Sequence, residues 1–317
     1  MERHYEKSYR EDYRMKNLIE RLAENFRQYD AKISILSTTH LGELRDRFQK
    51  FVLSGKISEV VHDKYIKRFK FDMPEALPSA KSIIIIAIPQ KISIFTFHVQ
   101  GKPYDVIYPP TYLSRDVRMN CLKTLSISPD MSDHHIVRAT LPLKLLAASS
   151  GLGVYGRNQL SYTEGMGSFC RLEAYFTDQQ FDEYDLQEVG KLPECAECSR
   201  CVKSCPAKCI KGDEFYIEAE RCLTHFNEHE GEFPEWIKPK FHNALVGCMM
   251  CQKVCPLNKT LAKEKERLDT FSDEETDLIL KKVPLEELPE KMRSRLIDME
   301  LDDYYPMLDR NLSALIK

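Results

Sequence analysis

The sequence predicts an α+β fold in which helices surround a few strands, followed by a small cysteine-rich module and a short helical tail. The apolar run SIIIIAI, from Ser82, is typical of a strand that is buried on both faces. Other segments have the apolar spacing of helices, and two groups of cysteines lie between about residues 191 and 258. These patterns predict three parts: 1–190, 191–260 and 261–317.

The first predicted element is an amphipathic helix in MKNLIERLAENFRQY. Its apolar residues share one helical face: Leu18, Ile19, Leu22, Phe26 and Tyr29. A strand is expected at 82–88, and a second at about 92–99, where ISIFTFHV roughly alternates. The proline-rich segment YPPTY then predicts a bend.

A second helix, LPLKLLAASS, should end before Gly151, because glycine suits a helix C-terminus. The glycine-rich loop GLGVYGRNQLSYTEGMGSF follows, and RLEAYFT at 171–177 predicts the next strand. Such glycines let backbone approach a ligand closely, but two connecting turns would use them equally well. GLGVYG is not a dinucleotide fingerprint, because it follows a helix instead of a strand.

Composition is that of an ordinary globular protein, with 43% hydrophobic and 30% charged residues. The sequence has neither a secretory signal near Met1 nor an apolar run of the roughly 18–20 residues that cross a bilayer. We therefore expect a cytoplasmic protein that is not attached to a membrane. Residues 260–317 carry 10 Lys and Arg against 15 Asp and Glu, a net charge of −5, which disfavours nucleic acid there.

The segment CAECSRCVKSCP has the spacing C-x2-C-x2-C-x3-C-P, which is typical of 4Fe–4S proteins. In proteins with two clusters, three cysteines of such a run bind one cluster and the fourth binds the other. A second segment, CMMCQKVCP, is incomplete, because Leu245 occupies the position of its first cysteine. The second cluster therefore needs a thiolate from elsewhere in the chain.

Cys222 is the predicted remote ligand. Cys209 is the alternative, but it follows Cys205 by only four residues, where reaching the second cluster would be awkward. The prediction is two 4Fe–4S clusters. The first is bound by Cys195, Cys198, Cys201 and Cys255, and the second by Cys205, Cys222, Cys248 and Cys251.

Disulfides and a zinc site are the alternatives for these cysteines. The total of 11 cysteines is odd, and disulfides are rare in a reducing cytosol. Zinc sites favour two separated pairs of ligands, whereas this chain has evenly spaced runs that end in Cys-Pro. Cys121 and Cys170 are left over and are expected to be ordinary buried thiols.

Several segments together resemble the epoxyqueuosine reductase family: KLLAASSGLGVYGRNQLSY, then GSF with LEAYFTD, the two cysteine runs, and RCL between them. The resemblance is strong from about 140 to 258 and weaker in PSAKSIIIIAIP. It implies a cobalamin-binding α/β domain, related to nitroreductase-like cobalamin folds and reductive dehalogenases, beside a ferredoxin-like module. It also implies Cys222 as the remote ligand. The corresponding cofactor-binding candidates are Gly151, Leu152, Gly153, Tyr155, Gly156, Arg157, Asn158, Ser161 and Tyr162.

Two departures from the family bear on the substrate. The position of the family's catalytic aspartate holds Val137, and an alternative alignment on Pro142 places no aspartate there either. The nearest candidate proton donors are Asp133, His134 and His135. The family members that act on tRNA continue into basic helical repeats, whereas this chain ends in an acidic segment, so we do not expect tRNA as a partner.

The sequence thus predicts an oxidoreductase that passes electrons through two clusters to cobalamin, which reduces an unidentified small molecule. The expected electron donor is a low-potential carrier such as ferredoxin or flavodoxin. One alternative is an electron-transfer protein that reduces the corrinoid of a partner protein. A second alternative is a relative that binds flavin instead of cobalamin.

Overall fold

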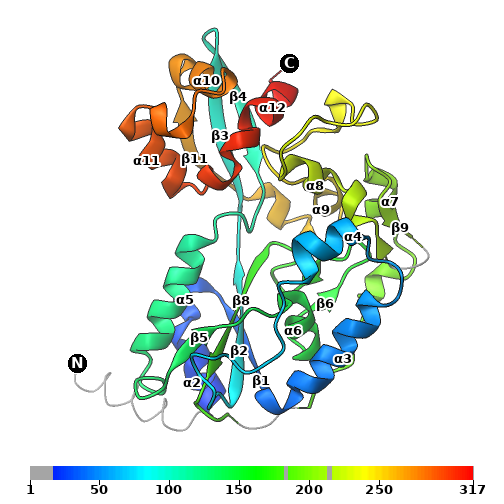
Figure 1. The fold of residues 1–317 in the computed structure, drawn as a ribbon, viewed down its shortest axis with the longest axis vertical. Helices are drawn as coiled ribbons and strands as arrows, with labels where there is room; N and C mark the ends of the chain where they lie inside the picture. Colours follow the sequence, from blue (N-terminus) through cyan, green and yellow to red (C-terminus); the bar gives the residue numbers. More distant parts are fainter. Residues whose placement is uncertain (1–16, 182–184, 213–215, 317) are drawn as a thin grey trace.

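The N-terminal part of the chain forms a four-stranded antiparallel sheet, in the order β1-β2-β8-β5, with helices on both faces (Figure 1). The computed structural model describes residues 17–181, 185–212 and 216–316. The strands are β1 (Lys32–Ser37), β2 (Ser82–Pro89), β5 (Ile136–Arg138) and β8 (Cys170–Thr177). The helices are α2 (Leu18–Asn25), α3 (Leu41–Val52), α4 (Glu59–Val61), α5 (Arg115–Ile127) and α6 (Leu143–Ser149).

Strand β2 is buried on both faces, as the run of isoleucines predicts. Ile83 and Ile85 belong to the core that includes α3 and α6. Ile84 and Ile86 point to the opposite face and pack with α2 and α5. Successive side chains of a strand alternate between faces, so a central strand covered on both sides needs an unbroken apolar run.

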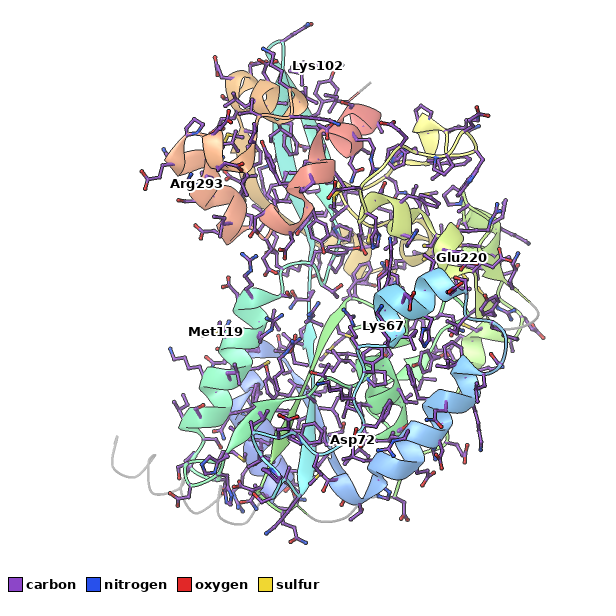
Figure 2. All side chains as sticks on the ribbon, in the orientation of Figure 1. Lys67, Asp72, Lys102, Met119, Glu220 and Arg293 are labelled. Carbon is purple, nitrogen blue, oxygen red and sulfur yellow. The ribbon has the colours of Figure 1, made fainter. Side chains whose placement is uncertain are left out.

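A second sheet, in the order β11-β3-β4, forms a separate lobe with the C-terminal helices (Figure 1). Its strands are β3 (Ile92–Val99), β4 (Lys102–Tyr108) and β11 (Lys265–Phe271). The helices are α10 (Asp273–Leu280), α11 (Glu290–Asp298) and α12 (Tyr305–Leu315). Figure 2 shows Lys102 at the outer end of the β3–β4 hairpin and Arg293 on α11 of the same lobe.

The tail expected to be short and helical contains α10, α11 and α12 but also a strand, β11, which pairs in parallel with β3. The segment KERLDTF is polar and mostly exposed, so it has no apolar alternation that would predict a strand. It pairs with β3 because β4 is hydrogen-bonded to only one edge of β3, which leaves the other edge free. The boundary expected near residue 190 is also crossed, since residues 92–108 build this C-terminal lobe.

The cysteine-rich module lies beside both lobes (Figure 1). Its helices are α7 (Arg200–Ser204), α8 (Leu223–Asn227) and α9 (Met250–Lys253), and α7 packs against α9. Its strands are β9 (Ile210–Lys211) and β10 (Tyr216–Ile217), while β6 (Val154–Tyr155) and β7 (Ser161–Tyr162) form a hairpin in the glycine-rich loop. Among the described residues, no helix is long and apolar enough to span a membrane.

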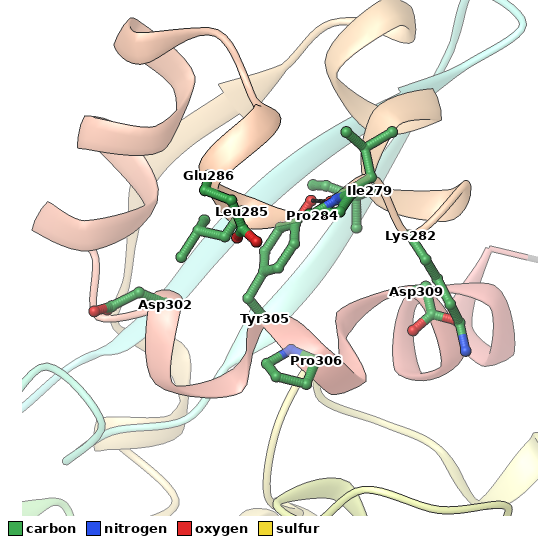
Figure 3. A pocket seen from close by; sticks show the side chains of 10 residues that line it. Ile279, Lys282, Pro284, Leu285, Glu286, Asp302, Tyr305, Pro306 and Asp309 are labelled. Atoms are coloured by element: carbon green, nitrogen blue, oxygen red, sulfur yellow. Dashed lines mark hydrogen bonds and ion pairs between the residues drawn. The ribbon is translucent and has the colours of Figure 1, made fainter.

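A cavity of about 280 Å³ opens in the C-terminal lobe between α10 and α12 (Figure 3). Tyr305 lies at its centre and donates a hydrogen bond to the carbonyl of Val283 over 2.7 Å. Lys282 and Asp309 form an ion pair of 3.1 Å at its edge. All the residues that line it come from 279–309, so it belongs to neither the cysteine module nor the glycine-rich loop.

Candidate iron–sulfur site and the glycine-rich loop

Both Cys-Pro pairs turn the chain sharply after a short helix. Cys205 follows α7 with φ −65° and ψ 113°, and Cys255 follows shortly after α9 with φ −69° and ψ 126°. A residue before proline is excluded from helical backbone and becomes extended. The last cysteine of each run is therefore turned away from the cysteines before it, as sharing of ligands between two clusters requires.

The first predicted set of thiols is gathered in the structure. Burial, with the neighbouring thiols Cys255 and Cys198, raises the pKa of Cys195. Burial likewise raises the pKa of Cys201, with Cys195 and Cys198 adding to the effect. These interactions place Cys195 near Cys198, Cys201 and Cys255.

The second set is gathered in the same way and lies deeper. Burial raises the pKa of Cys248 to about 11, with contributions from Cys222 and Cys205. Burial also raises the pKa of Cys251 well above its usual value, with Cys248 and Cys222 adding to it. In the described part of the chain, no three His, Cys, Asp or Glu side chains converge on one point as ligands of a single metal ion would.

The donors around these sulfurs fit iron–sulfur clusters, whose ligand thiolates carry negative charge. The N–H of Arg157 points at Sγ of Cys195 over 3.4 Å, and the amide of Asn243 donates to Sγ of Cys248 over 3.3 Å. Sγ of Cys205 lies 3.4 Å from Sγ of Cys209 and accepts three backbone N–H groups, and these interactions lower its pKa. Such bonds stabilise thiolates and tune a bound cluster.

Cys209 lies close to two thiols of the second set, although reaching the second cluster was expected to be awkward for it. Its Sγ is 3.4 Å from Sγ of Cys205, and it also hydrogen-bonds Cys222. The β9–β10 hairpin brings it there, because the carbonyl of Cys209 accepts from the N–H of Glu218 over 2.9 Å. The choice of Cys222 as the ligand stays a prediction.

The glycine-rich loop lies directly against these cysteines. The Tyr162 hydroxyl hydrogen-bonds Cys255, and the Asn158 side chain hydrogen-bonds Cys251 and, over 3.1 Å, the Tyr162 hydroxyl. The guanidinium of Arg157 donates to carbonyl oxygens of the cysteine module, those of Cys195, Ala196 and Gly212. Arg157 and Asn158 therefore hold the loop and the module together, which is a different role from the expected contact with a cofactor.

Two of the loop glycines are needed by the loop itself. A Cβ on Gly153 would lie 2.5 Å from Oγ of Ser161, and one on Gly156 would lie 2.4 Å from the ring of Tyr162. Gly151 ends α6 with φ +76°, as expected for a helix C-terminus. The remaining candidates, Leu152 and Tyr155, are partly buried, and Tyr155 is in the β6–β7 hairpin.

The candidate proton donors are not brought to this loop. His134 and His135 each place Nδ1 3.1 Å from a carboxylate oxygen of Asp178, and Asp133 is exposed nearby. Asp178 follows the last residue of β8, whereas the opposite end of that strand, at Cys170, contacts the loop through Thr163. An eight-residue strand is roughly 25 Å long, so these groups lie far from the cysteines. Val137 lies in β5 and packs against the apolar core.

A second group of titratable side chains lies beside Cys222 and was not expected. The hydroxyl of Tyr65 is 3.3 Å from Nδ1 of His225 and 3.4 Å from Nε2 of His229, and Tyr112 hydrogen-bonds Glu228. Burial, with Glu228 and Cys222 as neighbours, raises the pKa of Tyr65 to about 12. The i, i+4 spacing of the histidines is visible in LTHFNEHE, but Tyr65 comes from another segment.

Fold and site define an iron–sulfur protein: residues 194–258 match the 4Fe-4S double cluster binding domain family. The epoxyqueuosine reductase of Lactococcus garvieae is 36% identical over 114 residues, which cover 36% of this chain and 31% of that protein. The epoxyqueuosine reductase of Atelocyanobacterium thalassa is 25% identical over 217 residues, covering 64% and 67%. The chain is therefore similar to epoxyqueuosine reductases over part of its length, and residues 194–258 carry the match to a 4Fe-4S double cluster domain. It spans about one third to two thirds of these relatives' lengths.

Solved structures show the same fold. Epoxyqueuosine reductase from Streptococcus thermophilus superposes with a TM-score of 0.59 at 19% identity, over 95% of this chain and 81% of that one. A second structure is of epoxyqueuosine reductase with an epoxyqueuosine-modified tRNA stem loop. It has a TM-score of 0.53 at 22% identity, over 76% and 65% of the two chains. The expectation that tRNA is not a partner of this chain stays a prediction.

Proposed function

We propose that this protein passes low-potential electrons through two 4Fe–4S clusters to a cobalamin bound at the glycine-rich loop, for reduction of a substrate. The observation that carries the proposal is the contact between loop and cysteines. Residues 156–162 reach one thiol of the first set through the N–H of Arg157, at 3.4 Å from Cys195, and another through Tyr162. A group bound by this loop would lie beside the first cluster, so electron transfer between them would cross only a short distance.

The proposed clusters are supported by neighbouring thiols within each set and by N–H groups that donate to their sulfurs. The fit of cobalamin rests on less. Among the described residues, the buried hydroxyl of Ser161 has no hydrogen-bond partner, so it is available to a bound group. Cobalamin, when bound, supplies the redox chemistry at cobalt, and the chain binds it, supplies electrons and shields it from water.

The substrate is proposed to be other than epoxyqueuosine in tRNA. Val137, at the position of the family's catalytic acid, packs in the core and cannot donate a proton. The histidine candidates are held by Asp178 at the other end of β8. The same placement favours the second candidate function, an electron-transfer protein that reduces the corrinoid of a partner, because that role requires no proton donor beside the loop.

The test is the absorption spectrum of anaerobically purified protein before and after addition of cobalamin. A bound corrinoid gives bands that the broad cluster absorption lacks, and we expect them to stay with the protein through gel filtration. Flavin released on denaturation would instead be recognised by its fluorescence. Clusters without retained corrinoid or flavin would favour the electron-transfer role, which reduction of an added corrinoid protein would then test. Protein without clusters would refute both functions.

A further inference from the structure

Cys209 is a fifth thiol at the second set of cysteines, which already has four thiols for four irons. Its side chain is fully buried, 1% exposed, between Cys205 and Cys222. The Sγ–Sγ distance to Cys205 is 3.4 Å, within hydrogen-bonding range for sulfur. The backbone N–H of Cys209 also donates to Sγ of Cys205, so both the side chain and the backbone of Cys209 contact that sulfur.

The hydrogen-bond donors around the three thiols distinguish Cys205 and Cys222, as ligand sulfurs, from Cys209. Cys205 accepts backbone N–H groups of Ala207, Cys209 and Ile210, and Cys222 accepts from both the N–H and the hydroxyl of Thr224. Sulfurs that accept several donors are suited to carry the negative charge of a ligand thiolate. The Cys209 thiol instead lies 3.4 Å from Sγ of Cys205 and also contacts Cys222. A sulfur that binds iron does so as a thiolate and has no proton to give, so the S–H of Cys209 is the donor in these contacts once the cluster is bound.

We propose that Cys209 is a positioning residue that donates S–H hydrogen bonds to the ligand sulfurs Cys205 and Cys222, thereby raising the reduction potential of the second cluster. This inference rests on the proposed function, since it requires that Cys205 and Cys222 bind a cluster. The physical reason is electrostatic. A reduced cluster carries one more negative charge, and hydrogen bonds to its sulfurs stabilise that state more than the oxidised one.

The test compares Cys209→Ala and Cys209→Ser with the wild-type protein, all purified anaerobically with their clusters. Cys121→Ala is the matched control, because Cys121 is an equally buried thiol on α5, outside the cysteine module. Iron content is measured first, and the midpoint potential of each cluster is then obtained from a redox titration followed by electron paramagnetic resonance.

We expect all three variants to keep the iron content of the wild type. Cys209→Ala should shift one of the two potentials to a more negative value. Cys209→Ser should return that potential toward the wild-type value, because a hydroxyl can donate where a methyl group cannot. Cys121→Ala should leave both potentials unchanged.

Three outcomes would overturn the inference. Loss of about half of the iron in Cys209→Ala would identify Cys209 as a ligand. Full iron with both potentials unchanged would show that the thiol does not tune the cluster, while leaving the proposed function intact. Wild-type protein that binds no iron after anaerobic reconstitution would refute the proposed function and this inference with it.

Discussion

The backbone N–H of Arg157 donates a hydrogen bond to Sγ of Cys195 over 3.4 Å. The Arg157 guanidinium also donates to the carbonyl oxygen of Cys195, at the start of the same cysteine run, and to that of Gly212, after its end. This residue joins the glycine-rich loop of the N-terminal part to the first cysteine motif. The two segments therefore form one structural unit, although 38 positions separate the two residues. We therefore expect a substitution in either segment to alter the structure of the other.

Replacement of Cys222 by alanine should damage the second cluster and leave the first intact. Without Cys222 that cluster keeps only three of its assigned thiolates, so iron content should fall by about half. Cys170→Ala is the control, since Cys170 is a buried thiol on β8 that contacts Thr163. Iron and acid-labile sulfide measured on anaerobic protein decide the outcome, and full iron in Cys222→Ala would contradict the assignment.

Gly153→Val and Gly156→Val should abolish cobalamin binding. A side chain at either position would collide with Ser161 or Tyr162, so the loop must shift away from its present path. Gly42→Val is the control, because no atom lies within 4 Å of a Cβ at Gly42, on the exposed face of α3. The measurement is cobalamin affinity from absorption titrations. Unchanged affinity in both loop variants would show that cobalamin does not bind at this loop.

Glu173→Gln should lower stability substantially. The Glu173 carboxylate is 1% exposed and pairs with Arg138 at 3.0 Å and with Arg171 at 3.1 Å. Removing its charge leaves two arginines without their buried partner, at a cost of about 2–4 kcal/mol, allowing for their partial exposure. Glu164→Gln, which removes an exposed ion pair with Lys32, should have no measurable effect. Thermal unfolding of both variants tests this, and equal midpoints would contradict it.

Glu228→Gln should stabilise the protein at neutral pH and flatten its pH dependence. Burial raises the pKa of Glu228 above its usual 4.5, opposed by the hydrogen bond from Tyr112. A carboxyl with a raised pKa contributes stability that is complete below its unfolded pKa and is lost as pH rises through the folded value. Glutamine avoids that loss and can still accept from Tyr112. Urea unfolding between pH 5 and pH 8 is the measurement, and an identical pH dependence in the variant would contradict the prediction.

The protein should not restore queuosine in cells that lack epoxyqueuosine reductase. Loss of a general acid costs roughly 10²–10⁴ in rate, and the acidic segment 260–317 offers little for phosphate contacts. Mass spectrometry of tRNA nucleosides measures queuosine in these cells, with a bona fide reductase as the positive control. Restoration to near wild-type levels would show that both departures are tolerated.

The sequence by itself determined the features that depend on local spacing. SIIIIAI predicted a doubly buried strand because alternation along a strand is a local property, and β2 is that strand. Each Cys-Pro pair ends its run in extended backbone, which is also a local effect because proline restricts the residue before it. The cysteine spacing predicted a module for two clusters, and residues 194–258 match the 4Fe-4S double cluster binding domain family.

Only the tertiary structure decided which distant segments meet. The polar segment Lys265–Phe271 became a strand because β3 had a free edge, which its own residues do not reveal. Cys209 came within 3.4 Å of Cys205 through a hairpin, and Gly153 and Gly156 proved necessary for packing inside their own loop. His134 and His135 contact Asp178, which follows β8 at the end of the strand that lies far from the cysteines. Contacts of this kind depend on how the whole chain fills its core, so short-range patterns cannot determine them.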